Sequence, residues 1–327
     1  MTLYSDLLHS LIHAFPNSVS SRDFSKEFNC SERDYLEAFR SLADKNYPVE
    51  RKHDAFYLRV PMVSEEKLIS LTRFLKTDFS YVVKEAVPST NTFALNHFSS
   101  IKEGSVILTH HQTKGKGRLG RQWSSAIGKS VALSIVLSPS INPRSLPLIT
   151  QLTAAALCKS LKKYGDAKIK WPNDILLNGK KIAGILIESQ FQGNQFQGLV
   201  IGVGINSNLD SEDFDEALLQ KASSIKMETH RVVDPNELIA DFLTRFDHYY
   251  CEWLETHNSL PFISVCKKES VLLGKEITVF SPNQPSRQAI VKNINEQGEL
   301  MVQYHDQNVV TPLQSLDFSV RSRNGYS

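Results

Sequence analysis

The strongest constraint on the fold is that the hydrophobic pattern changes twice along the chain. The first sixty residues have short stretches of helical spacing, the residues up to about 265 alternate between strand and helix patterns, and the last sixty hold short strand-like runs. A chain of 327 residues is long enough for two or three domains. We therefore predict units at 1–60, 67–267 and 268–327, with a linker at 61–66.

The first unit has the pattern of three short helices followed by a β-hairpin. Apolar spacing predicts a helix over 4–15, and serines suited to capping predict helices over 21–28 and 32–45. Residues 47–58 then read as a hairpin. This order is typical of a winged helix-turn-helix, in which the third helix enters a DNA groove and the hairpin forms the wing.

The charge of this unit gives only limited support to DNA binding. Residues 1–60 hold eight Lys/Arg and nine Asp/Glu, whereas phosphate contact favours a basic surface. A domain that contacts only protein therefore remains an alternative. If DNA is bound, the candidate residues are Ser31, Arg33 and Arg40 at the third helix and Arg51 and Lys52 in the hairpin.

The middle region mixes antiparallel hairpins with helices, which favours a layered α+β fold. We expect helices over 64–75, 146–164 and 234–257. The expected strands are 105–110, 130–137, 169–171, 175–177, 182–189 and 197–203. Asn178-Gly179 is a strong hairpin turn between two of these strands.

The last unit is predicted to be all β. Four short strand patterns are separated by turn residues, at 275–280, 288–294, 300–304 and 309–312. Short strands at this spacing are typical of a small five-stranded barrel of SH3-like proportions.

Residues 112–123, Gln-Thr-Lys-Gly-Lys-Gly-Arg-Leu-Gly-Arg-Gln-Trp, give the clearest indication of a ligand site. Three glycines let the backbone approach a ligand closely. Four cations within the same stretch favour an oxyanion such as a phosphate. A solvated basic loop is the plainer explanation, but this density of glycine and charge makes a ligand loop the better one.

Two familiar phosphate-binding motifs are matched only in part. Gly115-x-Gly117-x-x-Gly120 fits the dinucleotide pattern, but a strand-like run follows it instead of a helix, and no acidic residue occurs between Gly120 and Asp166. Gly128-Lys129-Ser130 resembles the end of a P-loop, but the first glycine of that motif is replaced by Trp123.

Four further motifs carry polar residues in places where they can serve a site. Ser89-Thr90-Asn91 precedes a helical stretch, so it suits either a helix cap or a compact polar ligand. Lys-Trp-Pro-Asn-Asp spans 170–174, and Lys181 lies at the start of an apolar strand. Gly-Val-Gly-Ile-Asn, ending at Asn206, closes the next strand.

Composition excludes some classes of protein. Hydrophobic content of 41% and charged content of 22% are ordinary for a globular protein, and a net charge of +2 does not indicate a polyanion partner. The four cysteines have no metal-like spacing, and we expect no metal held by protein side chains. No leader or membrane-spanning pattern is evident, so we expect a cytoplasmic protein without membrane contact.

Five of these motifs occur in the order found in biotin–protein ligases. They are Ser-Thr-Asn, the 112–123 loop, Lys-Trp-Pro-Asn-Asp, Lys-Ile-Ala-Gly-Ile-Leu-Ile-Glu and Gly-Val-Gly-Ile-Asn. With the expected first and last units, the chain resembles the bifunctional form that is both biotin–[acetyl-CoA-carboxylase] ligase and biotin operon repressor. The resemblance implies a central mixed α/β ligase domain of the biotin/lipoate ligase kind.

The resemblance also implies substrates and partners. Biotin and ATP with Mg²⁺ would form biotinyl-5'-AMP, and biotin would then pass to a lysine of the biotin carboxyl carrier protein of acetyl-CoA carboxylase. Operator DNA and a homodimer formed when biotinyl-AMP is bound are the further partners implied. Lys116 departs from the pattern, because repressor-type members often carry arginine there, and lysine lacks the planar two-donor fork.

Site roles follow from the same resemblance. Lys181 and Arg118 would act in catalysis. Biotin would be bound by Ser89, Thr90, Asn91, Gln112, Lys116, Gly117, Arg118 and Lys181. The nucleotide would contact Gly115, Arg121, Trp123, Asn173 and Asn206, with Asn173 also near Mg²⁺. Arg321 lies where the last unit could reach the site.

Three alternatives stay open. The chain could be a ligase whose winged helix does not bind DNA. It could be a regulator that binds an adenylate only as a signal. It could also be a lipoate or octanoate transferase of similar fold, although Lys-Trp-Pro-Asn-Asp with the glycine-rich loop favours biotin.

Overall fold

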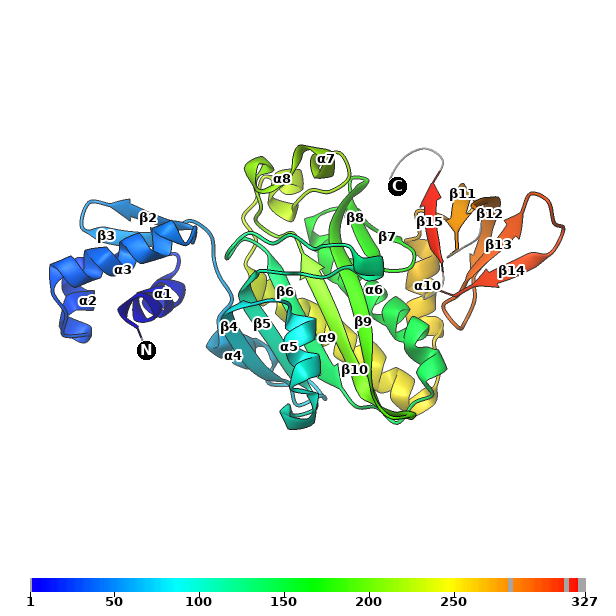
Figure 1. The fold of residues 1–327 in the computed structure, drawn as a ribbon, viewed down its shortest axis with the longest axis horizontal. Helices are drawn as coiled ribbons and strands as arrows, with labels where there is room; N and C mark the ends of the chain where they lie inside the picture. Colours follow the sequence, from blue (N-terminus) through cyan, green and yellow to red (C-terminus); the bar gives the residue numbers. More distant parts are fainter. Residues whose placement is uncertain (1, 282–284, 315–317, 323–327) are drawn as a thin grey trace.

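A computed structural model describes residues 2–281, 285–314 and 318–322 of the chain. The expected turn at 282–283 lies outside the described residues. Figure 1 shows a small N-terminal unit, a large central sheet with helices, and a C-terminal antiparallel sheet, in chain order. No helix of the described chain is both long and apolar enough to cross a membrane.

The N-terminal unit consists of three helices and a small sheet. The helices are α1 (Leu3–Ala14), α2 (Ser21–Glu27) and α3 (Glu32–Asp44). The short β1 (Val19–Ser20) pairs with the hairpin of β2 (Val49–Lys52) and β3 (Ala55–Leu58), in the order β1-β3-β2. Leucines of α1 and the rings of Phe24, Tyr35 and Phe56 form a separate core. The predicted helices and hairpin are therefore present.

The central unit is built on a seven-stranded mixed sheet with the order β4-β5-β6-β10-β9-β8-β7. Its strands are β4 (Ser80–Val87), β5 (Ser105–Gln112), β6 (Val131–Leu137), β7 (Ala167–Lys170), β8 (Asp174–Leu177), β9 (Lys180–Gln192) and β10 (Gln195–Ile205). Only the β4–β5 pair is parallel within this sheet. The expected α+β class is thus confirmed at the level of a mixed fold.

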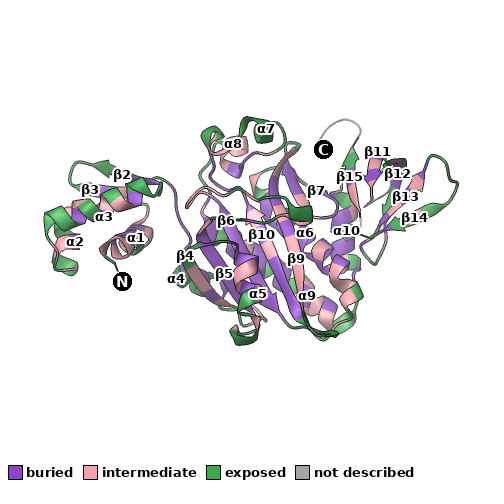
Figure 2. Cartoon of the chain, viewed as in Figure 1, coloured by how far each residue is buried: buried purple, intermediate pink, exposed green. Residues whose placement is uncertain are grey.

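Helices cover both faces of the sheet (Figure 2), and alternate residues of β5 contribute to two different cores. On one face, Val106 and Leu108 belong to the main core together with α6 (Leu146–Leu161) and α9 (Pro235–Thr256). On the other face, Ile107 packs with Ala94 of α5 (Thr90–Asn96). The other helices of this unit are α4 (Glu65–Thr72), α7 (Glu216–Leu219), α8 (Ile225–Thr229) and α10 (Leu260–Lys268).

The C-terminal unit is an antiparallel sheet with the order β14-β13-β12-β11-β15. Its strands are β11 (Glu276–Phe280), β12 (Arg287–Ile294), β13 (Leu300–Tyr304), β14 (Val310–Leu313) and β15 (Ser319–Ser322). Among the described residues, no pairing joins the edge strands β14 and β15, so the strand bonds by themselves do not close a barrel. Trp171 ties this sheet to the central unit, because its indole N–H donates to the Gly298 carbonyl at 3.0 Å.

Some boundaries differ from the sequence expectation. The strand expected at 169–171 ends at Lys170, because Trp171 and Pro172 turn out of the sheet. The helix expected over 146–164 ends at Leu161 and continues only as a 3-10 turn. β4 and α10 had no counterpart among the expected elements.

The segment between the first two units is buried and hydrogen-bonded. Met62 belongs to the N-terminal core and Val63 to the central core. The Asn236 side chain accepts from the Ser64 N–H at 2.8 Å and donates to the Met62 carbonyl at 3.0 Å. Ser64 also caps α4. The two units therefore meet through a fixed joint.

Candidate functional site

Two adjoining cavities lie beside the central sheet, and five residues line both. The larger cavity has a volume of about 590 Å³ and the smaller about 50 Å³. The shared residues are Gly117, Arg118, Trp123, Asn173 and Lys181. Two ligand groups, one in each cavity, would therefore meet in front of these residues.

The small cavity has a polar wall made by the start of α5 and the end of β5. Ser89 caps α5, accepting from the Thr92 N–H. The Gln112 carboxamide oxygen accepts from the backbone N–H of Thr90 at 2.9 Å and from its hydroxyl at 3.2 Å. The sequence offered a helix cap and a polar site as alternatives for this triplet, and the structure allows both.

Asn91 is held from three sides at the floor of this cavity. Its amide nitrogen donates to Glu188 at 2.8 Å and to the Leu186 carbonyl at 3.1 Å, while its oxygen accepts from Ser134 at 2.6 Å. A Cβ added at Gly202 would collide with the Asn91 carboxamide. The glycine of β10 is therefore needed for this side chain to lie flat on the sheet.

The glycine-rich loop folds back on itself beyond β5. The Gly117 N–H donates to the Arg121 carbonyl at 2.7 Å, and the Trp123 N–H donates to the Gly115 carbonyl at 2.9 Å. The tip turns through Leu119 and Gly120, both at positive φ. Gly115 is buried and lines neither cavity; a Cβ there would meet the Trp123 carbonyl, so its contribution is to the shape of the loop.

Lys181 lies at the junction of the two cavities. Its ammonium is 2.6 Å from the Asp174 carboxylate and lies over the Trp123 ring, 5.4 Å from the ring centroid. The side chain is 23% exposed, so it is not the solvated turn lysine that its sequence position also permitted. The Trp123 ring rests against Gly184 and Gly204, where any Cβ would crowd it.

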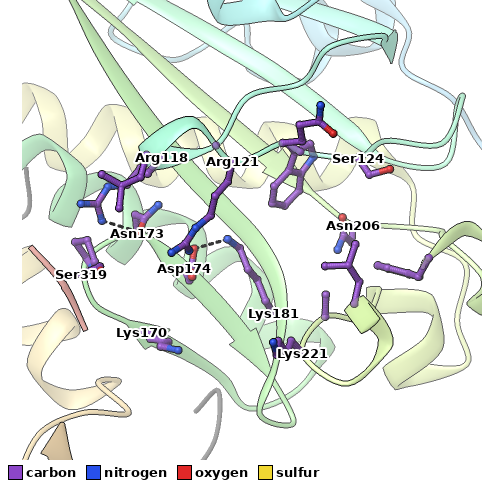
Figure 3. Close-up of a pocket in the computed structure, with 18 of the residues that line it drawn as sticks. Arg118, Arg121, Ser124, Lys170, Asn173, Asp174, Lys181, Asn206, Lys221 and Ser319 are labelled. Carbon is purple, nitrogen blue, oxygen red and sulfur yellow. Dashed lines mark hydrogen bonds and ion pairs between the residues drawn. The ribbon is translucent and has the colours of Figure 1, made fainter. Parts of the chain in front are cut away.

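Arg118 connects the glycine-rich loop to the 170–174 motif and to the C-terminal unit (Figure 3). Its guanidinium donates to the Asn173 carboxamide oxygen at 3.3 Å and to the Phe318 carbonyl at 3.3 Å. Ser319, Val320 and Arg321 of β15 also line the large cavity. The C-terminal sheet therefore contributes to the site, and Arg321 lies at its wall as the sequence suggested.

The large cavity is basic on one side and apolar on another. Arg121, Lys170 and Lys221 line it together with Leu209, Phe214 and Leu218 (Figure 3). Burial lowers the pKa of Lys170 to about 8, since the charged form is poorly solvated there. Such a wall suits a ligand with both anionic and flat apolar parts.

The remaining predicted ligand-site residues are also placed by the structure. Lys116 is exposed and lines the small cavity. Asn206 is buried at the edge of the large cavity, where its amide donates to the Ser223 carbonyl at 3.0 Å. Of all the residues predicted for biotin or nucleotide, only Gly115 lies outside both cavity walls.

The residues predicted for DNA all belong to the N-terminal unit, and none of them lines either cavity. Arg33, Arg40, Arg51 and Lys52 are exposed. The Ser31 hydroxyl is used in the capping box of α3, where it bonds with Asp34. Lys52 lies 3.5 Å from Glu50, and Arg51 donates to the His53 carbonyl within the hairpin turn.

Sequence reasoning missed several residues of the site. Ser134 is fully buried and bonds to both Thr90 and Asn91; a hydroxyl inside an apolar strand was the available signal. Lys170 and Asp174 belong to the Lys-Trp-Pro-Asn-Asp motif, but nothing in the sequence indicated a role for either of them. The apolar wall residues Leu209, Phe214 and Leu218 had no local signal, because only the tertiary fold brings them to the cavity.

The fold and the site together define a class of protein: a mixed α/β ligand-binding domain in which cations gather between a small polar and a large basic cavity. The chain matches the sequence profile of the Biotin/lipoate A/B protein ligase family over residues 83–206. It is 30% identical to the bifunctional ligase/repressor BirA of Bacillus spizizenii, over 80% of this chain and 82% of that protein. The chain belongs to the biotin/lipoate A/B protein ligase family and is therefore an enzyme, a ligase.

Other comparisons agree with this assignment. The biotin–[acetyl-CoA-carboxylase] ligase of Paracoccus denitrificans is 30% identical over 65% of this chain and 90% of its own length. The fold is similar to a biotin protein ligase from Aquifex aeolicus solved in complex with biotin and ATP. That likeness has a TM-score of 0.63 at 21% identity, and covers 74% of this chain and 98% of that one.

Proposed function

We propose that this protein joins biotin to ATP, forming biotinyl-5'-AMP, and transfers biotin to a lysine of the biotin carboxyl carrier protein of acetyl-CoA carboxylase. Relatives named biotin–[acetyl-CoA-carboxylase] ligase support biotin as the acid and this carboxylase as the recipient. The observation that carries the proposal is the shared wall, where Arg118 and Lys181 face both cavities. A carboxylate in one cavity would meet a phosphate in the other at these cations.

Biotin is assigned to the small cavity. Its ureido ring offers two N–H donors and one carbonyl acceptor, and it would bond to Ser89, Thr90, Asn91 and Gln112. The cavity is narrow in this structure, so the loop carrying Lys116 and Gly117 has to move to admit the ring. Lys116 and Arg118 would hold the carboxylate.

ATP is assigned to the large cavity. Arg121 and Lys170 would contact its phosphates, and the Trp123 ring with the apolar wall would hold the adenine. Asn173 and Asn206 would fix the nucleotide further, and Gly115 would shape the loop above it.

Mg²⁺ fits the oxygen donors at the cavity wall. The Asp174 carboxylate and the Asn173 carboxamide lie beside each other there, and Mg²⁺ is usually bound by one or two such oxygens with substrate phosphates. When bound, the ion would offset phosphate charge.

The chemistry then needs cations and positioning. In the first step, a biotin carboxylate oxygen attacks the α-phosphorus of ATP, and pyrophosphate leaves. Lys181 and Arg118 stabilise the negative charge that gathers there. In the second step, an uncharged carrier lysine attacks the biotinyl carbonyl and AMP leaves. Substrate groups supply both nucleophiles, so the protein contributes orientation and exclusion of water.

Biotin-dependent ATP–pyrophosphate exchange tests the first step. Lys181→Ala should lower exchange by roughly 100-fold or more, the usual cost of losing one charge-stabilising donor. Lys180→Ala is the matched control, because Lys180 is adjacent on β9 yet lines neither cavity. An absence of biotin-dependent exchange in the wild-type protein would refute the proposal.

The polar wall of the small cavity favours biotin over lipoate. Lipoate carries an apolar dithiolane ring, which would leave the donors and acceptors of Thr90, Asn91 and Gln112 without ligand partners. Lipoate should therefore fail to support exchange and should not compete with biotin. Exchange with lipoate or octanoate equal to that with biotin would favour a transferase of that kind.

We also propose that the N-terminal unit is a winged helix-turn-helix that represses a biotin operon in response to biotinyl-AMP, with the chain acting as a homodimer. The helix–hairpin order and the names of the BirA relatives support this role. A gel shift on operator DNA with biotin and ATP tests it, and Arg51→Ala with Lys52→Ala should weaken the shift. If no shift occurs at low salt, the ligase operates without this DNA contact.

A further inference from the structure

Two histidines of α1 and one glutamate of α4 lie together on the surface between the first two units. His9 and His13 are four residues apart, so they share one face of the helix, with ring centroids 4.2 Å apart. The Glu66 carboxylate faces both: one oxygen is 3.6 Å from His9 Nε2, and the other is 3.5 Å from His13 Nε2. One nitrogen or oxygen atom from each residue lies within 4.8 Å of those of the other two.

The hydrogen bonds around the cluster orient it for a cation. His13 Nδ1 lies 3.0 Å from the His9 carbonyl, a contact that requires a proton on Nδ1. In the neutral ring this leaves the lone pair on Nε2, which faces Glu66. Metal-bound histidines commonly have this second bond to a carbonyl. Glu66 is fixed in turn by the Ser64 hydroxyl at 2.8 Å.

The spacing of the three residues suits tetrahedral coordination. Zinc–ligand bonds of about 2.0–2.1 Å at tetrahedral angles place neighbouring ligand atoms about 3.3 Å apart. Each histidine Nε2 lies at about this distance from a different Glu66 oxygen, 3.6 Å for His9 and 3.5 Å for His13, so the carboxylate spans both rings. Small side-chain rotations would bring all three ligand atoms onto one ion, with solvent supplying the fourth ligand, because the residues are exposed.

We propose that His9, His13 and Glu66 form a binding site for a divalent transition ion such as Zn²⁺. Two imidazoles and one carboxylate favour zinc over Mg²⁺ or Ca²⁺, which prefer ligand sets made of oxygen. None of the three residues lines the ligand cavities, so the site is separate from the ligase chemistry.

An ion at this position would cross-link the N-terminal unit to the central one. His9 and His13 belong to the three-helix unit, whereas Glu66 lies in the first turn of α4, beyond the joint at Met62 and Ser64. The bound ion would therefore add a second link between the two units and disfavour local opening of the joint. Arg59 is exposed and lies just before this joint. Because trypsin cleaves after arginine, the rate of cleavage after Arg59 measures how often the joint opens.

Equilibrium dialysis of the full untagged chain against ZnCl₂ in Mg²⁺-containing buffer tests the site. Wild-type protein should bind one Zn²⁺ per chain, and His9→Ala and Glu66→Gln should each weaken binding at least about tenfold. Co²⁺ in place of zinc should give visible absorption bands of a tetrahedral centre in the wild type only. His248→Ala is the matched control, since His248 is an exposed histidine that faces a single carboxylate, Glu252 on α9, and belongs to no three-residue cluster among the described residues.

The outcomes separate the site from an ordinary ion-pair cluster. Absence of zinc binding, or equal binding by wild type, His9→Ala and Glu66→Gln, would overturn the proposal. Zinc should also slow tryptic cleavage after Arg59 in the wild type but not in Glu66→Gln. Equal slowing of cleavage in both proteins would refute this cross-link, because zinc would then act at another site.

Discussion

Among single residues, Gly202 leaves space for the Asn91 side chain, and this role can be tested. A methyl group at this position would displace the Asn91 carboxamide from the floor of the small cavity. We predict that Gly202→Ala raises the Kd for biotin about tenfold, the effect of losing about 1.4 kcal/mol of binding free energy. Isothermal titration calorimetry measures this change.

The control for Gly202 is a double-mutant cycle with Asn91→Ala. If Gly202 acts through Asn91, truncating the asparagine makes room for the new methyl group, and Gly202→Ala then has little further effect. Additive losses from the two substitutions would contradict this explanation.

Lys170 gives a prediction on pH dependence. Its buried ammonium has a pKa of about 8, so it is mostly charged at pH 7 and mostly neutral at pH 9. Because the charged form attracts phosphate, kcat/KM for ATP should fall as pH rises through 8. In Lys170→Arg the charge persists, and this fall should be absent. A fall of the same size in both proteins would assign the titration to another group.

The residues that sequence reasoning found and missed differ in one physical respect. Lys181 and the Ser-Thr-Asn triplet lie at ends of elements, where a polar side chain next to an apolar run is visible in the sequence. Ser134 lies inside a strand, where a polar residue usually signals an exposed face. Its burial depends on the partners Thr90 and Asn91, which only the folded sheet brings to it.

At the level of elements, long apolar patterns predicted their helices well. α3 and α9 carry an apolar stripe, whereas α6 is buried on nearly every side, and all three begin and end within a few residues of the prediction. β4 was missed because Lys84 and Glu85 interrupt its apolar alternation at an edge of the sheet. The order of the seven strands could not be predicted, because local sequence carries no information on which hairpins meet.

One buried indole, that of Trp171, contributes to the contact between the central and C-terminal sheets. Trp171 is 1% exposed, and its N–H donates to the Gly298 carbonyl. We predict that Trp171→Phe lowers the free energy of unfolding by about 2–4 kcal/mol, from the lost hydrogen bond and the cavity left behind. Urea denaturation followed by circular dichroism measures the loss. A change below about 1 kcal/mol would mean that the two sheets are held mainly by other contacts.

In the whole molecule, the segment that directly follows the 112–123 loop is in contact with the N-terminal unit. Ile127, four residues beyond Trp123, packs against the N-terminal core, and Gly128 lies against Met62 and Pro48. A second contact involves Glu85 of β4, which accepts from the Tyr4 hydroxyl at 2.8 Å and pairs with the Lys45 ammonium at 3.1 Å. β4 ends two residues before Ser89, so both contacts lead from the N-terminal unit to the ligand cavities.

From this contact we predict that ligand binding at the cavities changes the dynamics of the N-terminal unit. When biotin and ATP order the loop, the chain from Trp123 to Ile127 loses freedom, and the surface under Ile127 should be protected from hydrogen exchange. We expect amides near Tyr47 and Val49 to exchange more slowly with ligands in the wild type, and this effect to be lost in Ile127→Ala.

The matched control for the coupling is Ile141→Ala. Ile141 is also a partly buried isoleucine, but it packs on the central core and not on the N-terminal one. This variant should keep the ligand-dependent protection at Tyr47, and both variants should keep ATP–pyrophosphate exchange, because neither side chain lines a cavity. If Ile127→Ala retains full protection, the signal must travel through Glu85 and β4, and Glu85→Gln should then abolish it.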